Sequence, residues 1–336
     1  MSRPQSKKNF RILPIFTFCL IMVVAIIFIT AFRQRIIDQV TVWEYKPSLQ
    51  ATSLIERSGM NSNGMFYFDA SQPSLYNQST ATAFNKVCNN EEMSTAILGC
   101  YTGNQIYIYQ VTDPQLAGIS VVTAAHETLH AIYARMGATE KVKVDQMLEA
   151  EYAVLSKNSY YSSLMAFYST YEPGQRDNEL HSIIGTEVAN LNPALEQYYD
   201  QYFSNRQDVV NSYNQYNNVF KSLQDQANAI SKQIDSLMAT ITSLSSQYNS
   251  DANVLKDDIS SFNIRAQNGD FVSQADFNEE RDVLTGRALA LDVRRATIES
   301  DYTTYQNLVS QYNSYATQSQ KLYNTINSTL VSSPSA

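Results

Sequence analysis

The chain has 336 residues, a formal net charge of -8 and 17% charged residues. Its length suits one or two domains, and its 44% hydrophobic residues allow a packed core. The lack of a basic excess argues against nucleic acid as a partner, because phosphate binding requires clustered Lys and Arg. With only 10 Gly and 8 Pro, the composition favours long helices, and we expect a mainly α (α+β) fold.

Residues 12–32 form an apolar run without a charged side chain. A helix needs roughly 20 such residues to cross the hydrocarbon core of a membrane. No small-x-small cleavage site follows, so we interpret the run as an uncleaved transmembrane signal anchor, with a cleaved signal peptide as the alternative. Lys and Arg in the tail 1–11 place the N-terminus in the cytoplasm. The bulk of this single-pass chain is then expected outside the cell membrane.

The segment after the apolar run is expected to open a domain that spans residues 33–205. Its first part, up to Pro47, has helical spacing. Residues 65–68 are interpreted as a short strand and residues 69–82 as a loop. Cys88 and Cys100 are the two cysteines outside the apolar run, and they either form a disulfide or stay free.

A small β element is expected in the middle of this domain. Gly103-Asn104 signals a turn, and residues 105–111 alternate in the manner of a strand, with a hairpin as one arrangement. We expect this strand to lie at an edge, where it can bind an extended substrate by strand addition. Asp113-Pro114 ends it.

Helices fill the rest of the domain. Residues 119–136 predict one apolar helix that stops at Gly137. One or two further helices are expected within residues 139–170. Residues 176–191 have helical character with an interruption at Gly185, and Asn192-Pro193 is typical of a helix start.

Residues 206–330 are expected to form a coiled coil. Apolar residues recur every three or four positions from Val209 to Tyr248 and again from Leu284 to Leu330, with a turn at residues 268–270 between them. We predict an antiparallel helical hairpin, with parallel self-association as the alternative. The flanking positions are mostly Ser, Gln and Asn rather than Glu and Lys, so we expect charged pairs to select the partner helix only weakly. The hairpin offers a surface for a protein partner, and residues 331–336 are expected to be a disordered tail.

The chemistry is expected at residues 126–130, which read His-Glu-Thr-Leu-His and lie within the expected helix 119–136. Residues four apart share one helical face, so His126 and His130 can bind one zinc ion, the cofactor we expect. Glu127 can reach a zinc-bound water, whose pKa is lowered towards about 7. Glu127 then acts as the general base and passes the proton to the leaving amine.

This H-E-x-x-H motif resembles that of the zincin metallopeptidases. Because the longer H-E-x-x-H-x-x-G-x-x-H pattern is absent, the chain is more similar to the gluzincin branch, in which a downstream Glu is the third zinc ligand. The resemblance covers the motif and residues 100–190. It implies a zincin-like metallopeptidase domain within residues 33–205 that hydrolyses a protein or peptide substrate.

Several residues qualify as the third ligand: Glu149, Glu151, Glu179, His181 and Glu187. Glu179 is preferred because its surroundings resemble the third-ligand helix of gluzincins, although the acid that often follows four residues later is replaced by Ile183. Glu187 lies two turns further along the same helix face and is the runner-up. His181 is interpreted as supporting a ligand, stabilising a transition state or serving only a structural role.

Two other interpretations compete with a zinc metallopeptidase. In the first interpretation, the chain is a membrane-tethered coiled-coil scaffold with a structural or vestigial metal site. In the second, the two histidines are structural residues of an amphipathic helix. Glu127 favours the enzyme, because a structural zinc site needs no general base. Enzyme and scaffold are also compatible if the hairpin recruits or gates a substrate.

Overall fold

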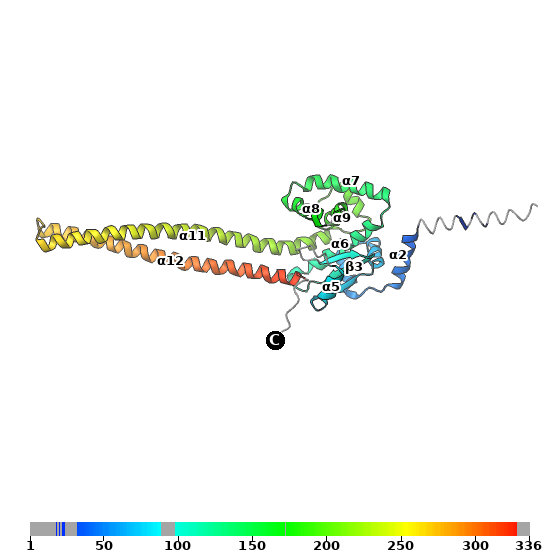
Figure 1. The fold of residues 1–336 in the computed structure, drawn as a ribbon, viewed down its shortest axis with the longest axis horizontal. Coiled ribbons are helices and arrows are strands. Elements are labelled where there is room, and N and C mark those ends of the chain that lie inside the picture. The colour runs from blue at the N-terminus through cyan, green and yellow to red at the C-terminus, as the bar shows by residue number, and fades with distance from the viewer. Residues whose placement is uncertain are drawn as a thin grey trace, which may run out of the picture. The chain divides into compact units, whose positions relative to one another are not determined.

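The computed structural model describes residues 18, 20, 22, 23, 32–88, 98–171 and 173–327. In these residues the fold is mainly helical, with one small three-stranded sheet and two long C-terminal helices (Figure 1). The chain divides into two compact units. The first comprises Met1–Asn217 and Tyr323–Ala336, and the second comprises Asn218–Leu322.

Among the described residues, no helix has both the length and the apolar character needed to cross a membrane. The expected transmembrane anchor, residues 12–32, falls almost entirely outside the described part, which includes only residues 18, 20, 22, 23 and 32 of it. The expected tails 1–11 and 331–336 also lie outside the described residues.

The first unit begins with three helices and then alternates short helices with strands. Its elements up to residue 116 are α2 (Arg33–Glu44), α3 (Leu49–Arg57), α4 (Ser62–Ala70), β1 (Ser74–Tyr76), the 3-10 turn η1 (Gln78–Thr80), α5 (Ala81–Val87), β2 (Gly99–Thr102), β3 (Gln105–Tyr109) and the 3-10 turn η2 (Pro114–Leu116). The helices that follow are α6 (Gly118–Arg135), α7 (Ala138–Leu155), α8 (Ser159–Tyr171), α9 (Arg176–Glu187) and α10 (Pro193–Tyr199).

The strands form one sheet in the order β1-β3-β2, with β1 parallel and β2 antiparallel to β3. The expected hairpin is confirmed, since Gly103 and Asn104 join β2 to β3 with φ angles of 58° and 64°. The expectation that residues 105–111 form an edge strand is wrong. Strand β3 is the middle strand because β1, supplied by a distant segment, pairs with its other side, and this leaves β2 at an edge.

The prediction for residues 65–82 is wrong in part. Residues 65–68 belong to helix α4, and residues 74–82 contain β1, η1 and the start of α5. The side chain of Asn61 accepts hydrogen bonds from the backbone N–H groups of Asn63 and Gly64 and so begins α4. A run of four apolar residues is too short for its periodicity to distinguish strand from helix.

A disulfide joins Cys88 to Cys100, with 5.7 Å between the two Cα atoms. It links the residue after α5 to strand β2, and it decides between the two alternatives that the sequence left open. Cys88 is buried against Phe84 and Tyr109 in a small apolar cluster of its own. The disulfide therefore ties the end of α5 to an edge strand that also pairs with β3 and packs against α6.

Helix α6 is almost entirely buried, and it packs against α9 and against strands β2 and β3. The close approach of α9 depends on Gly185. A Cβ atom there would lie 2.5 Å from Leu129 Cδ1 and 2.8 Å from Tyr199 Cε1. The expected interruption at Gly185 is wrong, because α9 continues through it to Glu187.

The second unit is built from α11 (Gln207–Asn268) and α12 (Gln274–Ile326), which run side by side (Figure 1). Salt bridges at seven-residue intervals show that the two helices are antiparallel: Arg265–Glu280, Asp258–Arg287 and Asp251–Arg294. The expected hairpin is thus present within one chain. These three pairs are partly exposed, and the expectation that charged pairs select the partner only weakly stays a prediction.

The apolar stripe of α11 follows the predicted positions, but that of α12 shifts by one residue at several places. Arg294, rather than Arg295, faces α11, and Tyr302 and Tyr312 are 51% and 40% exposed. Tyr305 is half-buried as predicted, whereas Tyr315 and Leu322 lie on the stripe in place of the predicted Ala316 and Tyr323. Closely spaced tyrosines give α12 two apolar stripes, and packing against α11 selects one of them.

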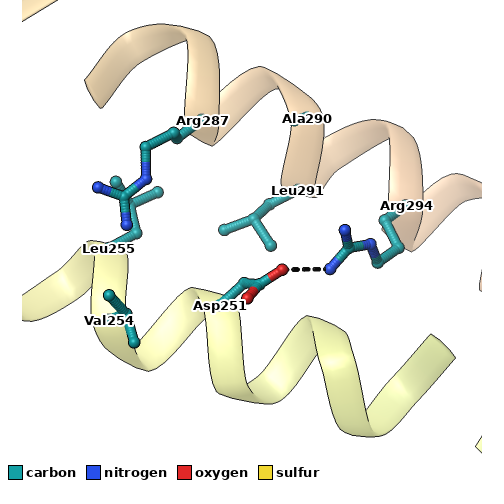
Figure 2. Close-up of a pocket in the computed structure, with 7 residues that line it drawn as sticks. All are labelled: Asp251, Val254, Leu255, Arg287, Ala290, Leu291 and Arg294. Carbon is teal, nitrogen blue, oxygen red and sulfur yellow. Dashed lines mark hydrogen bonds and ion pairs between the residues drawn. The ribbon is translucent and has the colours of Figure 1, made fainter. Parts of the chain in front are cut away.

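A cavity of about 250 Å³ lies between the two helices of the second unit. Figure 2 shows Arg287 and Leu255 at one end and Arg294 at the other, with Leu291 between the two arginines. Each arginine is already paired with an aspartate of α11. The cavity is therefore a charge-neutral gap in the hairpin core.

Candidate metal centre

Helices α6 and α9 bring His126, His130 and Glu179 together, although 49 positions separate His130 from Glu179 in the chain. The two Nε2 atoms of the histidines lie 3.0 Å apart. The Glu179 carboxylate lies 3.8 Å from Nε2 of His126 and 3.4 Å from Nε2 of His130. One ligand atom from each residue falls within 4.8 Å of the others, which is a metal-binding arrangement.

These separations fit one tetrahedral ion. Ligand atoms at about 2.0 to 2.1 Å from a tetrahedral zinc ion lie roughly 3.3 Å from one another. The observed 3.0, 3.4 and 3.8 Å lie around that value, where the 3.4 Å distance is from Oε1 of Glu179 to His130 and the 3.8 Å distance is from its Oε2 to His126. Two neutral imidazoles and one carboxylate also form a donor set that zinc accepts, with a fourth position left for water or substrate.

The ring of His130 is held by two residues of α9 on its other side. Nδ1 of His130 lies 3.0 Å from Oδ1 of Asn178 and 3.1 Å from Oγ of Ser182. Because an amide oxygen can only accept, Nδ1 donates to Asn178, and the Nε2 lone pair then faces the cluster. These two supports of His130 were not among the site residues expected from the sequence. The signal in the sequence that could have found them is their position, since Asn178 comes one residue before Glu179 and Ser182 three residues after it.

Burial sets the electrostatics of the cluster. Desolvation, followed by the nearby His130 and His181, holds the pKa of His126 well below its usual 6.5. A neutral imidazole is the form that binds a metal. The side chain of Glu179 is only 6% exposed, and a buried carboxylate is costly unless a cation or hydrogen bonds stabilise it. His126 is the most exposed of the three, with 17% of its side chain accessible to solvent.

Glu127 lies beside this cluster and against the start of strand β2. Glu127 is buried, with 5% of the residue exposed to solvent. A Cβ atom added to Gly99 would lie 2.7 Å from Oε1 of Glu127 and 2.4 Å from Cγ2 of Thr123. Gly99 therefore lets the β2 backbone approach the carboxylate of the expected general base. Gly99 was not among the site residues expected from the sequence, because its role depends on which strand packs against α6.

The runner-up Glu187 lies outside the cluster. Its carboxylate oxygen lies 3.3 Å from the hydroxyl of Tyr160, at the far end of α9 from Glu179. The pKa of Glu187 is raised from 4.5 to about 7. Desolvation raises it, and hydrogen bonds from Tyr160 and Tyr213 lower it by a smaller amount. Glu187 thus belongs to a tyrosine-lined site of its own.

The remaining candidates also have other partners. Glu149 pairs with Arg176, and Glu151 accepts hydrogen bonds from the backbone and side chain of Asn192. His181 is completely buried, with Nε2 at 2.7 Å from the hydroxyl of Tyr198. Burial lowers the pKa of His181 to about 3, so it is a neutral core residue.

Comparisons with protein-family models, with curated proteins and with solved structures find no match to this chain. The cluster of His126, His130 and Glu179 is accordingly the observation on which a function must rest. It is a buried group able to bind a metal ion, and its geometry does not by itself identify the metal.

Proposed function

We propose that the chain is a membrane-anchored zinc metallopeptidase of the zincin type, with His126, His130 and Glu179 as metal ligands. The observation that carries the proposal is the meeting of these three side chains with Glu127 beside them. A structural zinc site uses four protein ligands, whereas a catalytic site uses three and leaves one position open.

In the proposed reaction, zinc supplies Lewis acidity, which polarises the scissile carbonyl and lowers the pKa of water at the open position. Glu127 accepts a proton from the attacking water and passes it to the leaving amine. Asn178 and Ser182 hold the ring of His130 in the orientation that binding requires. Burial of the site strengthens these interactions by excluding bulk water.

Strand β2 is the element best placed to align a substrate. It is an edge of the sheet, and it begins at Gly99, against the carboxylate of Glu127. An extended peptide that pairs with β2 would gain backbone hydrogen bonds and bring its scissile bond near the general base. The proposed substrate is thus a protein or peptide bound in an extended conformation.

Two features support a location outside the cytoplasm. Disulfides such as Cys88–Cys100 persist in oxidising compartments. The charge-free run 12–32, preceded by Lys and Arg, has the composition of a signal anchor. We therefore propose a single-pass cell-membrane protein with residues 33–336 outside.

The alternative is a membrane-tethered scaffold in which the hairpin of α11 and α12 binds a protein partner. The long paired helices support it, because such hairpins offer an extended binding surface. The position of Glu127 favours the peptidase, and the hairpin is equally suited to recruiting a substrate for it.

The test is the zinc content and peptide cleavage of the full chain in detergent, beside Glu127→Gln and His126→Ala variants. We expect one zinc per chain in the wild type and in Glu127→Gln, with cleavage of casein or a peptide library reduced about 10²–10⁴-fold in the latter. His126→Ala should lose zinc as well. Glu149→Gln is the matched control, because Glu149 pairs with Arg176 outside the cluster.

Failure to bind zinc after reconstitution would contradict the proposal. Full cleavage by Glu127→Gln would also overturn the role of Glu127. Zinc binding without cleavage of any peptide in the library would favour the scaffold with a structural metal.

A further inference from the structure

Helix α2 has the reverse of the usual polarity of a surface helix. Ile36, Ile37, Val40 and Trp43 are 41%, 45%, 42% and 74% exposed. They fall at positions i, i+1, i+4 and i+7 and so share one face of the helix. Asp38, in contrast, points inward and is only 3% exposed. A helix of a soluble protein normally turns its apolar face to the core and its charges to water.

The inward polar face is held firmly, so this orientation is built into the fold. Both carboxylate oxygens of Asp38 accept hydrogen bonds from Arg135 of α6, at 3.0 and 3.1 Å. Gln34 donates to the same carboxylate at 3.0 Å. The guanidinium of Arg35 lies 3.8 Å above the ring of Phe66 in α4. Rotating α2 to bury its apolar face would break the contacts of Asp38 with Arg135 and of Arg35 with Phe66, whereas the Gln34–Asp38 hydrogen bond lies within α2 itself.

The chain itself indicates what covers the exposed face. The charge-free run 12–32 ends directly before α2, and its last residue, Phe32, is 49% exposed. A chain that leaves a bilayer at this point keeps the next few helical turns within reach of the headgroups. Trp is the residue that most favours that interface, and the exposed Arg33 and Lys46 suit anionic headgroups.

We propose that the apolar face of α2, formed by Ile36, Ile37, Val40 and Trp43, lies on the surface of a lipid bilayer. This inference rests on the membrane anchor of the proposed function, and it adds a second contact with the membrane. Because Asp38 ties α2 to α6, that contact would hold the helix of His126 and His130 at a fixed distance from the bilayer. A second copy of the chain is the competing occupant of this face.

Trp43 is the single Trp of the chain and therefore a built-in probe. The experiment reconstitutes the full chain into phosphatidylcholine vesicles with and without phosphatidylglycerol and first tests association by flotation. Trp43 fluorescence is then quenched by lipids brominated near the headgroup and, separately, by acrylamide in the water. We expect strong quenching by the lipids and an acrylamide quenching constant at least about threefold lower than for a water-exposed Trp.

The matched control is a Trp43→Phe, Val142→Trp double variant. Val142 is 57% exposed on α7, and the residues three and four positions away on its face are Ala138, Thr139, Asp145 and Gln146, so this face lacks the apolar stripe of α2. The new Trp should stay accessible to acrylamide and escape quenching by the lipids. Equal lipid quenching of both probes would overturn the proposal, because the effect would not be specific to α2.

The other outcomes also decide. If the protein floats with the vesicles but acrylamide still quenches Trp43, the proposed contact of α2 with the bilayer is overturned, while the membrane anchor is retained. Protection from acrylamide without lipid quenching, rising with the protein-to-lipid ratio, shows a second copy instead. A chain that does not float overturns both membrane contacts, while zinc binding and cleavage in detergent test the peptidase independently.

Discussion

Gly99 is the residue at which the sheet and the candidate metal centre meet. Its missing side chain allows the β2 backbone to lie against Thr123 and Glu127, which extend from the same side of α6. Oxygen Oε1 of Glu127 occupies part of the space that a Cβ atom would need. A general base must lie within hydrogen-bond reach of its proton, so in the proposed reaction this contact would affect catalysis as well as packing.

Replacing Gly99 by Ala should therefore displace the carboxylate of Glu127 and leave the metal ligands in place. We expect peptide cleavage to fall at least about 10-fold, since small misplacements of a catalytic group are costly, and zinc content to stay at the wild-type level. Gly137→Ala is the control, because a Cβ atom at Gly137 meets nothing within 4 Å. Unchanged kcat in Gly99→Ala would show that the carboxylate relaxes freely.

Glu187 is a titratable residue that the proposed reaction does not use. It faces the hydroxyls of Tyr160 and Tyr213, and burial raises its pKa from 4.5 to about 7. Tyr161 and Tyr216 also lie near enough for the charge of Glu187 to raise their pKa values. With these groups around it, the carboxyl favours its neutral form in the folded protein.

This shift predicts a pH-dependent stability. The folded state holds the proton up to about pH 7, whereas the unfolded chain releases it near pH 4.5, so stability falls as pH rises between these values. Glu187→Gln should remove this loss of stability at higher pH, because glutamine does not ionise. Its free energy of unfolding relative to wild type should change little at pH 5 and rise by on the order of 2 to 3 kcal/mol at pH 8.

Denaturant unfolding at the two pH values measures this difference. Glu149→Gln should not gain stability at pH 8, because its hydrogen bond to Arg176 lowers the pKa of Glu149 instead. An equal gain at pH 5 and pH 8 for Glu187→Gln would mean that packing rather than ionisation is responsible.

At the scale of elements, α2, α6 and β2 are joined through one arginine. Arg135, in the last turn of α6, pairs with Asp38 of α2 and donates a hydrogen bond to the hydroxyl of Tyr101 in β2. The side chains of Arg135 and Asp38 are 6% and 4% exposed. A buried pair with additional hydrogen bonds fixes the geometry of the elements it connects, even where its net contribution to stability is small.

Breaking this pair by Asp38→Asn should leave a buried, unpaired arginine. We expect the free energy of unfolding to fall by about 3 to 5 kcal/mol. Thermal or urea unfolding of the full chain in detergent measures the loss. The exposed pair Arg176–Glu149 provides the comparison, since Glu149→Gln should cost no more than about 1 kcal/mol. Similar losses in both variants would contradict the special role of the buried pair.

At the scale of the whole molecule, the two units derive their stability from different sources. The first has a continuous core that includes Leu129, Ile184 and Tyr199, all completely buried. The second is two helices thick, so most of its side chains remain partly exposed. It depends on a narrow apolar stripe and on packed phenylalanine rings at its turn, Phe262, Phe271 and Phe277.

Patterns that repeat within a few residues were predictable from the sequence alone. The spacing of His126 and His130 placed both on one face of a helix, and the three- and four-residue spacing from Val209 onwards predicted the first helix of the hairpin. The turn at Gly103-Asn104 and the cap at Asn192 were equally local. In each case the information lies within one or two helical turns or one tight turn.

The sequence determined the helical character, the placing of His126 and His130 on one helical face and the long hairpin, because these depend on local periodicity. Tertiary packing alone decided that Glu179 rather than Glu187 joins His126 and His130, since the choice depends on which end of α9 crosses α6. It also moved β3 to the middle of the sheet, brought Gly99 against Glu127 and selected the stripe of α12 that faces α11. Those contacts join residues tens of positions apart, and only the shape and burial of the packed elements specify them.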